Sequence, residues 1–223
     1  MNPPKFDVPQ LIILSRQRSG THFLESCLAS HPKVRGRGEC FIRYKKRLLG
    51  IITPNDIPRR DWVVFENQVD RLNIGILMYD HVPFFELHFG PLRDHKIIHL
   101  LRNPVAIANS EAQKLANREY YKEGYASHYR INQTPPPNRP FDPRLAEEMC
   151  RAIRQDQTIF AERLTTYPRV LTITYESITG NCHASNILQT AAETLLNFLN
   201  LEPHPLSTTL QKTGVFLGLP IAH

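Results

Sequence analysis

Residues 11–23 read LIILSRQRSGTHF and pass from an apolar run into a polar loop. The four residues 11–14 are all aliphatic, which is typical of a strand buried on both faces of a parallel sheet. The polar residues that follow include Gly20, the residue type that a tight turn needs. Apolar residues then recur at helical spacing until His31 and Pro32. This stretch therefore predicts a strand, a glycine-containing loop and a helix over residues 11–31.

The same alternation of strand and helix continues along the chain. Apolar runs predict strands over residues 74–79, 96–101 and 170–175. A helix is predicted to begin at Pro104 behind Asn103 as its N-cap, and two others to cover about 144–164 and 185–199. Strands that alternate with helices indicate a parallel sheet covered on both faces. With 223 residues, we expect one α/β domain over residues 1–223, interrupted by a proline-rich insertion loop at about 132–143.

Composition excludes several other classes of protein. Lysine and arginine number 27 against 21 acidic residues, and the net charge of +6 favours an anionic partner. No apolar run approaches the roughly 20 residues of a membrane helix. Residues 1–10 contain three prolines and no apolar stretch, so no signal peptide is expected there. The four cysteines form no CxxC pair, which argues against a disulfide scaffold and against a zinc site. We therefore expect a soluble, cytoplasmic protein.

The loop after the first strand has the features of an anion site. The first N–H groups of a helix lack intrahelical partners, and the helix dipole favours negative charge at that end. Arg16 and Arg18 add guanidinium groups, which bind phosphate oxygens in a bidentate manner, and Ser19 and Thr21 add hydroxyl groups. No lysine follows Gly20, so the loop of magnesium-dependent nucleoside triphosphatases is absent. A phosphate-like ligand that needs no magnesium fits better.

A second anion site is predicted where the strand over 96–101 meets its helix. Arg102 ends the strand, and Ser110 lies about two turns into the helix. An arginine at the carboxyl end of a strand faces the crevice where open α/β sheets bind ligands. Two anion sites at one edge of a sheet indicate a ligand with two separated phosphate groups.

Three segments together resemble the sulfotransferases that use 3′-phosphoadenosine 5′-phosphosulfate (PAPS). Residues 15–23 resemble their 5′-phosphosulfate loop, and the segment from Arg102 to Ser110 resembles their 3′-phosphate motif. Residues 174–178, TYESI, are similar to a tyrosine–glutamate segment near the end of that fold. The resemblance implies a three-layer αβα fold of P-loop-kinase-like topology around a parallel sheet. It also implies that Arg102 and Ser110 hold the 3′-phosphate and that the 5′-phosphosulfate is surrounded by Arg18, Ser19, Gly20, Thr21 and His22.

The chain departs from many members of that family at two positions. Arg18 stands where many relatives have lysine, and His22 stands where many have threonine. The Arg-Ser-Gly form is more frequent among bacterial enzymes that act on carbohydrates such as trehalose or Nod factors, so these members are the most similar. Lys212, in the polar stretch before the C-terminus, is expected to reach the nucleotide, as basic residues do in some relatives.

Two residues are candidates for the base that takes the acceptor's proton. Glu39 resembles the glutamate base of the trehalose-type bacterial enzymes, at a very similar spacing from the loop arginine. His81 resembles the histidine base of the cytosolic animal enzymes, but Tyr79 replaces the lysine that those enzymes have two residues earlier. We favour Glu39 because the loop is also of the bacterial type. Arg18 and the loop amides would stabilise the departing phosphate.

The sequence thus predicts transfer of a sulfuryl group from PAPS to a hydroxyl, or an amine, of a small-molecule, carbohydrate or lipid acceptor. The other product is 3′,5′-bisphosphoadenosine (PAP), and the motifs require no metal. Variable loops recognise the acceptor, so its identity stays open, as does the oligomeric state. The alternatives are a kinase of the same fold and a related protein that binds nucleotide without turnover. A nucleic-acid-binding domain is disfavoured because the arginines lie at two strand–helix junctions.

Overall fold

The computed structural model describes residues 8–49, 70–121, 129–130, 137–180, 187–208 and 210–211. Within these residues a parallel sheet has the strand order β2-β3-β1-β4-β6. Its strands are β1 (Leu11–Ser15), β2 (Val34–Gly36), β3 (Leu72–Met78), β4 (Lys96–Leu101) and β6 (Val170–Thr174). Two short antiparallel segments, β5 (Tyr129–Arg130) and β7 (Leu210–Gln211), pair with each other.

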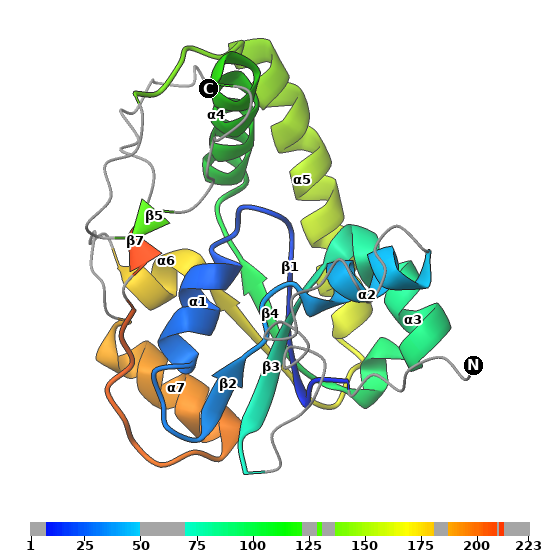
Figure 1. Ribbon diagram of the computed structural model, residues 1–223, viewed down its shortest axis with the longest axis vertical. Helices are drawn as coiled ribbons and strands as arrows, with labels where there is room; N and C mark the ends of the chain where they lie inside the picture. The colour runs from blue at the N-terminus through cyan, green and yellow to red at the C-terminus, as the bar shows by residue number, and fades with distance from the viewer. Residues whose placement is uncertain are drawn as a thin grey trace.

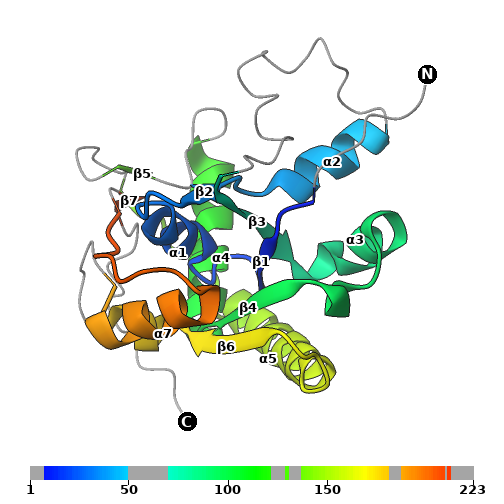
Figure 2. The same ribbon diagram turned by 90° about the horizontal axis from the view of Figure 1, so that it is seen from below.

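Helices cover both faces of this sheet (Figures 1 and 2). On one face lie α1 (Thr21–Leu28), α6 (Tyr175–Thr179) and α7 (Gln189–Leu199), and on the other lie α2 (Cys40–Leu48), α3 (Val82–Phe89) and the end of α5 (Pro143–Leu164). Two 3-10 turns, η3 (Tyr79–His81) and η4 (Leu92–Asp94), flank α3. In Figure 1, α4 (Pro104–Tyr121) and α5 run side by side away from the sheet.

The aliphatic run of β1 explains why this strand lies in the centre of the sheet. Leu11 and Ile13 belong to the apolar cluster under α1 and α7, whereas Ile12 and Leu14 belong to the cluster under α2 and α3. All four side chains are completely buried. Because side chains alternate between the two faces of a strand, only a strand covered on both faces buries an unbroken apolar run.

The strand order places the predicted site at a switch point of the sheet. From β1 the chain proceeds to β2 and β3 on one side, and then crosses to β4 and β6 on the other side. β1 pairs with both β3 and β4. Ligands of open α/β sheets bind outside the carboxyl ends of the strands at such a point. The loop that follows β1 and the residues that follow β4 flank this position.

Most predicted elements are present with small shifts of their ends. The strand predicted over 96–101 and the helix predicted to begin at Pro104 are confirmed at those residues. β3 begins at Leu72, two residues before the predicted start, because Leu72 pairs with Val34 of β2. Among the described helices, none is both long and apolar enough to cross a membrane.

Candidate functional site

The loop between β1 and α1 has a backbone that few sequences can adopt. Arg18 and Gly20 both have positive φ angles, of 66° and 92°. Gly20 also lies directly against the ring of Tyr175, and a Cβ at position 20 would be 2.3 Å from Cε2 of that ring. Glycine is therefore required twice, by its backbone angle and by the close approach of the ring. Tyr175 is the first residue of α6, so the TYESI segment contacts the predicted anion loop through this ring.

Hydrogen bonds join the predicted anion loop to the residues that follow β4. Arg102 Nη1 donates to the carbonyl oxygen of Arg18 at 2.8 Å, and Arg18 Nε donates to Ser110 Oγ at 3.2 Å. The guanidinium of Arg102 also lies over the ring of Tyr175, with its central carbon 4.7 Å from the ring centroid. The structure thus brings together four predicted residues that are far apart in the sequence.

The start of α4 is fixed by neighbouring side chains. Asn103 Oδ1 accepts a hydrogen bond from Val105 N at 2.9 Å, which confirms Asn103 as the N-cap. Glu176 Oε1 accepts from the backbone N–H of Asn103 at 3.0 Å, and Gln157 Nε2 of α5 donates to the carbonyl oxygen of Arg102 at 2.9 Å. Burial lowers the pKa of Arg102, against the raising effects of Tyr175 and Glu176. A guanidinium nevertheless stays charged at neutral pH.

The two arginines of the loop have different surroundings. Arg16 Nη1 lies 2.9 Å from Asp156 Oδ2 on α5, and its Nη2 lies 3.9 Å from Glu111 Oε2 on α4. Arg18 instead donates a hydrogen bond to Ser110. Of these two arginines, Arg16 thus forms ion pairs with acidic residues of α4 and α5, and Arg18 contacts a residue of the second predicted anion site.

Two hydroxyl residues of the predicted anion loop are buried. Ser19 is completely buried, and its Oγ has no hydrogen-bond partner within the described part of the chain. Thr21 begins α1 and is 3% exposed. A buried hydroxyl without a partner is costly, so Ser19 fits a site whose ligand supplies an acceptor oxygen.

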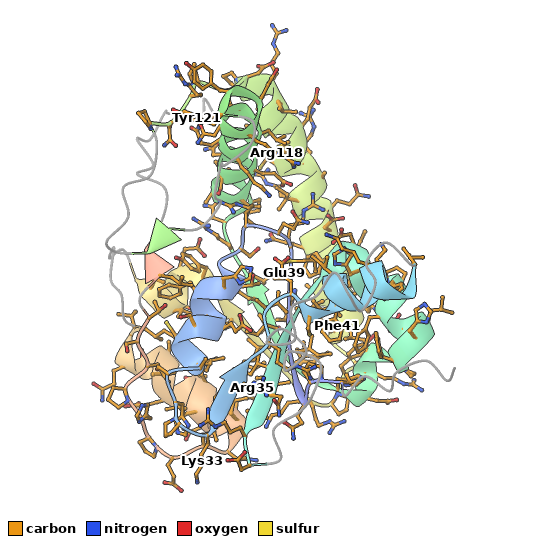
Figure 3. The ribbon with its side chains drawn as sticks, viewed as in Figure 1. Lys33, Arg35, Glu39, Phe41, Arg118 and Tyr121 are labelled. Carbon is orange, nitrogen blue, oxygen red and sulfur yellow. The ribbon has the colours of Figure 1, made fainter. Side chains whose placement is uncertain are left out.

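Glu39 lies beside the N-terminal end of α1 (Figure 3). His22 Nε2 is 3.2 Å from Glu39 Oε1, and His22 Nδ1 is 3.8 Å from Glu25 Oε2. Burial alone would lower the pKa of His22, but its interactions with the Glu25 and Glu39 carboxylates raise it to about 9. His22 is therefore an imidazolium at neutral pH, between two carboxylates.

His81 ends the 3-10 turn that follows β3, the strand next to β1. Its side chain is 13% exposed, Nε2 lies 3.6 Å from Asp80 Oδ2, and Nδ1 has no partner among the residues described. Tyr79, which replaces the lysine of the animal enzymes, stacks on Phe160 with ring centroids 4.0 Å apart. Its hydroxyl lies 2.6 Å from His99 Nε2. Tyr79 therefore belongs to the buried core.

Two residues that contact the candidate site were not predicted from the sequence. Glu25 follows His22 by three residues on a predicted helix, and this spacing places both on one face and could have indicated the contact. Asp156, the partner of Arg16, is distant in the sequence, and no local pattern indicates it. Lys212 and residues 132–136 of the proline-rich segment lie outside the described residues.

No known family model matches the sequence, and no curated protein matches it. Among solved structures, a sulfotransferase from Alicyclobacillus acidocaldarius superposes with a TM-score of 0.53 and 15% identity, over 94% of this chain and 87% of that one. The sulfotransferase domain from the curacin biosynthetic pathway superposes with a TM-score of 0.51 and 17% identity, over 90% and 77%. The mouse sulfotransferase SULT7A1 complexed with PAP aligns with a TM-score of 0.45 and 18% identity, over 89% and 61%. That last score is too low to inform the site.

These likenesses establish the fold. The chain has the P-loop-like α/β fold found in sulfotransferases, with a parallel sheet between two layers of helices. The fold class predicted from the sequence is therefore confirmed.

Proposed function

We propose that this protein is a PAPS-dependent sulfotransferase, related to the bacterial enzymes that act on carbohydrates. The observation that carries the proposal is the link between the two predicted anion sites at the switch point of the sheet. Arg18 contacts Ser110, and Arg102 contacts the backbone of Arg18. A ligand that has two phosphate groups on one nucleoside needs two cationic sites held at a fixed separation.

The donor would lie across these two sites. The 5′-phosphosulfate would bind the loop, where Ser19 offers its buried hydroxyl and the first amides of α1 are unpaired within the helix. The 3′-phosphate would bind Arg102 and Ser110, as the resemblance implies. Arg102 is well suited to this role because Tyr175 and the Arg18 carbonyl already restrict its side chain.

In the proposed reaction an acceptor oxygen attacks the sulfur atom of PAPS. The acceptor hydroxyl gives its proton to the Glu39 carboxylate, and a new S–O bond forms. The S–O bond to the 5′-phosphate breaks, and its electron pair leaves with PAP. Arg18 and the amides at the start of α1 would stabilise the negative charge on the leaving phosphate. Each of these groups belongs to the chain, and no step requires a metal.

The proposal is tested by the effect of Arg102→Ala on two nucleotides. Binding of PAP should weaken about 10- to 100-fold, because a charge-assisted hydrogen bond contributes about 1.5–3 kcal/mol. Binding of adenosine 5′-phosphate, which has no 3′-phosphate, should weaken only about 2- to 5-fold through the lost contact to the Arg18 carbonyl. Isothermal titration calorimetry measures both affinities.

The matched control is Arg118→Ala. Arg118 is an exposed arginine near the far end of the same helix, α4 (Figure 3). This variant should bind both nucleotides as the wild type does. Equal losses for the two nucleotides in Arg102→Ala would contradict the assignment of Arg102 to the 3′-phosphate.

A further inference from the structure

Three side chains form a continuous line beside the predicted anion loop. Glu25 and His22 lie one turn apart on α1, and Glu39 lies just before α2. The ring of His22 is between the other two, with Nδ1 at 3.8 Å from Glu25 Oε2 and Nε2 at 3.2 Å from Glu39 Oε1. Both ring nitrogens are therefore directed at carboxylates.

Glu25 also holds the backbone that leads to Glu39. Its side chain is 10% exposed, and Oε1 accepts a hydrogen bond from the backbone N–H of Gly38. Gly36 lies so close that a Cβ there would be 2.9 Å from Glu25 Oε1. One buried carboxylate thus fixes both the turn before Glu39 and the ring that contacts Glu39.

The β-sheet fixes the same turn from its other side. Arg37 N donates to the carbonyl oxygen of Ile74 at 2.9 Å, and Ile76 N donates to the carbonyl oxygen of Gly38 at 2.9 Å. The chain therefore continues its pairing with β3 for two residues beyond β2. Glu39 therefore follows directly on a segment whose backbone is hydrogen-bonded to both α1 and β3.

We propose that Glu25 and His22 are positioning residues, which hold the Glu39 carboxylate beside the anion loop as the proton acceptor of the transfer reaction. This inference rests on the proposed function. Glu25 fixes the imidazole ring, and the ring fixes Glu39. The backbone of His22 is part of the first turn of α1. Its ring contacts the two carboxylates and is not expected to bind the phosphosulfate.

The charge of His22 supports this arrangement. Among the described residues, Glu25 on its own helix and Glu39 on the neighbouring segment are titratable groups that face its ring, and they raise its pKa to about 9 despite its burial. A positive charge next to a carboxylate favours the ionised form of that carboxylate. Glu39 is then ready to accept the acceptor's proton at neutral pH, and the new S–O bond forms as the proton leaves the acceptor oxygen.

The first test is nuclear magnetic resonance titration of the His22 ring in the full chain. The wild type should show a pKa near 9 for His22. Glu39→Gln and Glu25→Gln should each lower that value by at least about one unit, because each removes one facing negative charge. A His22 that titrates near the ordinary value in the wild type, or that is unchanged in Glu39→Gln, would contradict the arrangement.

The second test is the rate at which the protein cleaves radiolabelled PAPS with water as the acceptor. His22→Gln should lower kcat about 10- to 100-fold, as expected for a misplaced base, with the affinity for PAP unchanged within about 2-fold. The acidic limb of the pH–rate profile should move to higher pH, since Glu39 loses its neighbouring positive charge. Glu25 is buried and its variant can unfold the chain, whereas His22 is partly exposed, with 29% of its side chain accessible.

His88→Gln on α3 is the matched control, because His88 is an exposed histidine away from this line. It should retain the wild-type rate and profile. Normal PAP binding with an unchanged rate and profile in His22→Gln would contradict the positioning role and would leave the proposed function intact. A wild-type chain that neither binds PAP nor cleaves PAPS would contradict the proposed function, and with it the catalytic part of this inference.

Discussion

At the scale of single residues, the two candidate bases have different environments. Glu39 is 35% exposed and lies in contact with His22 at the start of α1, next to the predicted anion loop. His81 is 13% exposed and follows β3, with Asp80 as its charged neighbour. A base must be able to reach the acceptor's hydroxyl near the transferred group. Glu39 precedes α2 and contacts His22 in the first turn of α1, so its carboxylate lies beside the predicted anion loop, and we therefore propose Glu39 as the base.

The two candidates are distinguished by one substitution at each. Glu39→Gln should retain PAP binding and slow PAPS cleavage by roughly 100-fold or more, because a positioned base contributes about that factor. His81→Gln should slow it by less than about 5-fold if His81 only helps to shape the site. Calorimetry and release of labelled sulfate measure the two effects. A normal rate in Glu39→Gln together with a slow rate in His81→Gln would contradict Glu39 as the base and would identify His81 as the base instead.

The contacts around the candidate site were predictable from the sequence for some residues and not for others, for a physical reason. Arg18, Arg102, Ser110 and Tyr175 lie in segments whose local pattern is informative, and the structure brings them into contact. The partners of Arg16 and His22 depend on tertiary packing. Asp156 lies on a helix far along the chain, and no local pattern connects it to Arg16.

At the scale of elements, a side-chain cap sets the start of α6, and a backbone hydrogen bond precedes the start of α7. Residues 170–175 were predicted as strand, but Tyr175 begins α6 because Thr174 Oγ1 accepts from Ser177 N at 3.1 Å and caps the helix. The last helix was predicted from about residue 185 and begins at Gln189. Leu188 precedes it in a non-helical conformation, and its N–H donates to the carbonyl oxygen of Ile178 at 2.8 Å. The short strand β2 and the helix α3 were not predicted, because neither has a clear apolar period.

The contact between the anion loop and α6 gives a prediction for Gly20. Gly20→Ala should lower the free energy of unfolding by about 1–3 kcal/mol more than Gly38→Ala does, as expected for overpacking. Both glycines have positive φ, so the backbone strain is common to the two variants. A new Cβ would collide with Tyr175 only at position 20, since nothing lies within 4 Å at position 38. Urea unfolding measures the difference, and equal losses would mean that the ring does not restrict the loop.

At the scale of the whole molecule, the fold class was predictable because periodicity and element order are global signals. An aliphatic strand, a polar glycine loop and alternating helices indicated a parallel sheet, and the structure confirms it. The extent of the domain, residues 1–223, stays a prediction.

Stability should depend on pH through two histidines with opposite shifts. Burial lowers the pKa of His99 to about 4, so the unfolded chain binds more protons there between about pH 4 and 6.5, and stability rises with pH. The pKa of His22 is raised to about 9, so its contribution is complete below pH 6.5 and is lost as pH rises through 9. For these two groups, the free energy of unfolding should be greatest near pH 6.5.

Urea unfolding at a series of pH values measures this profile. The alkaline decline should be about 1–3 kcal/mol in the wild type and absent in His22→Gln. Identical declines in both proteins would show that folding does not raise the pKa of His22.

We propose that the two linked, predicted anion sites bind one bisphosphorylated nucleotide. Calorimetric titration of PAP into the wild-type protein, with ATP and magnesium in a parallel titration, tests it directly. We expect micromolar binding of PAP that is unaffected by a metal chelator, and much weaker binding of ATP with magnesium. A preference for ATP with magnesium would favour a kinase of the same fold, and binding of neither nucleotide would contradict a nucleotide-binding role for the two sites.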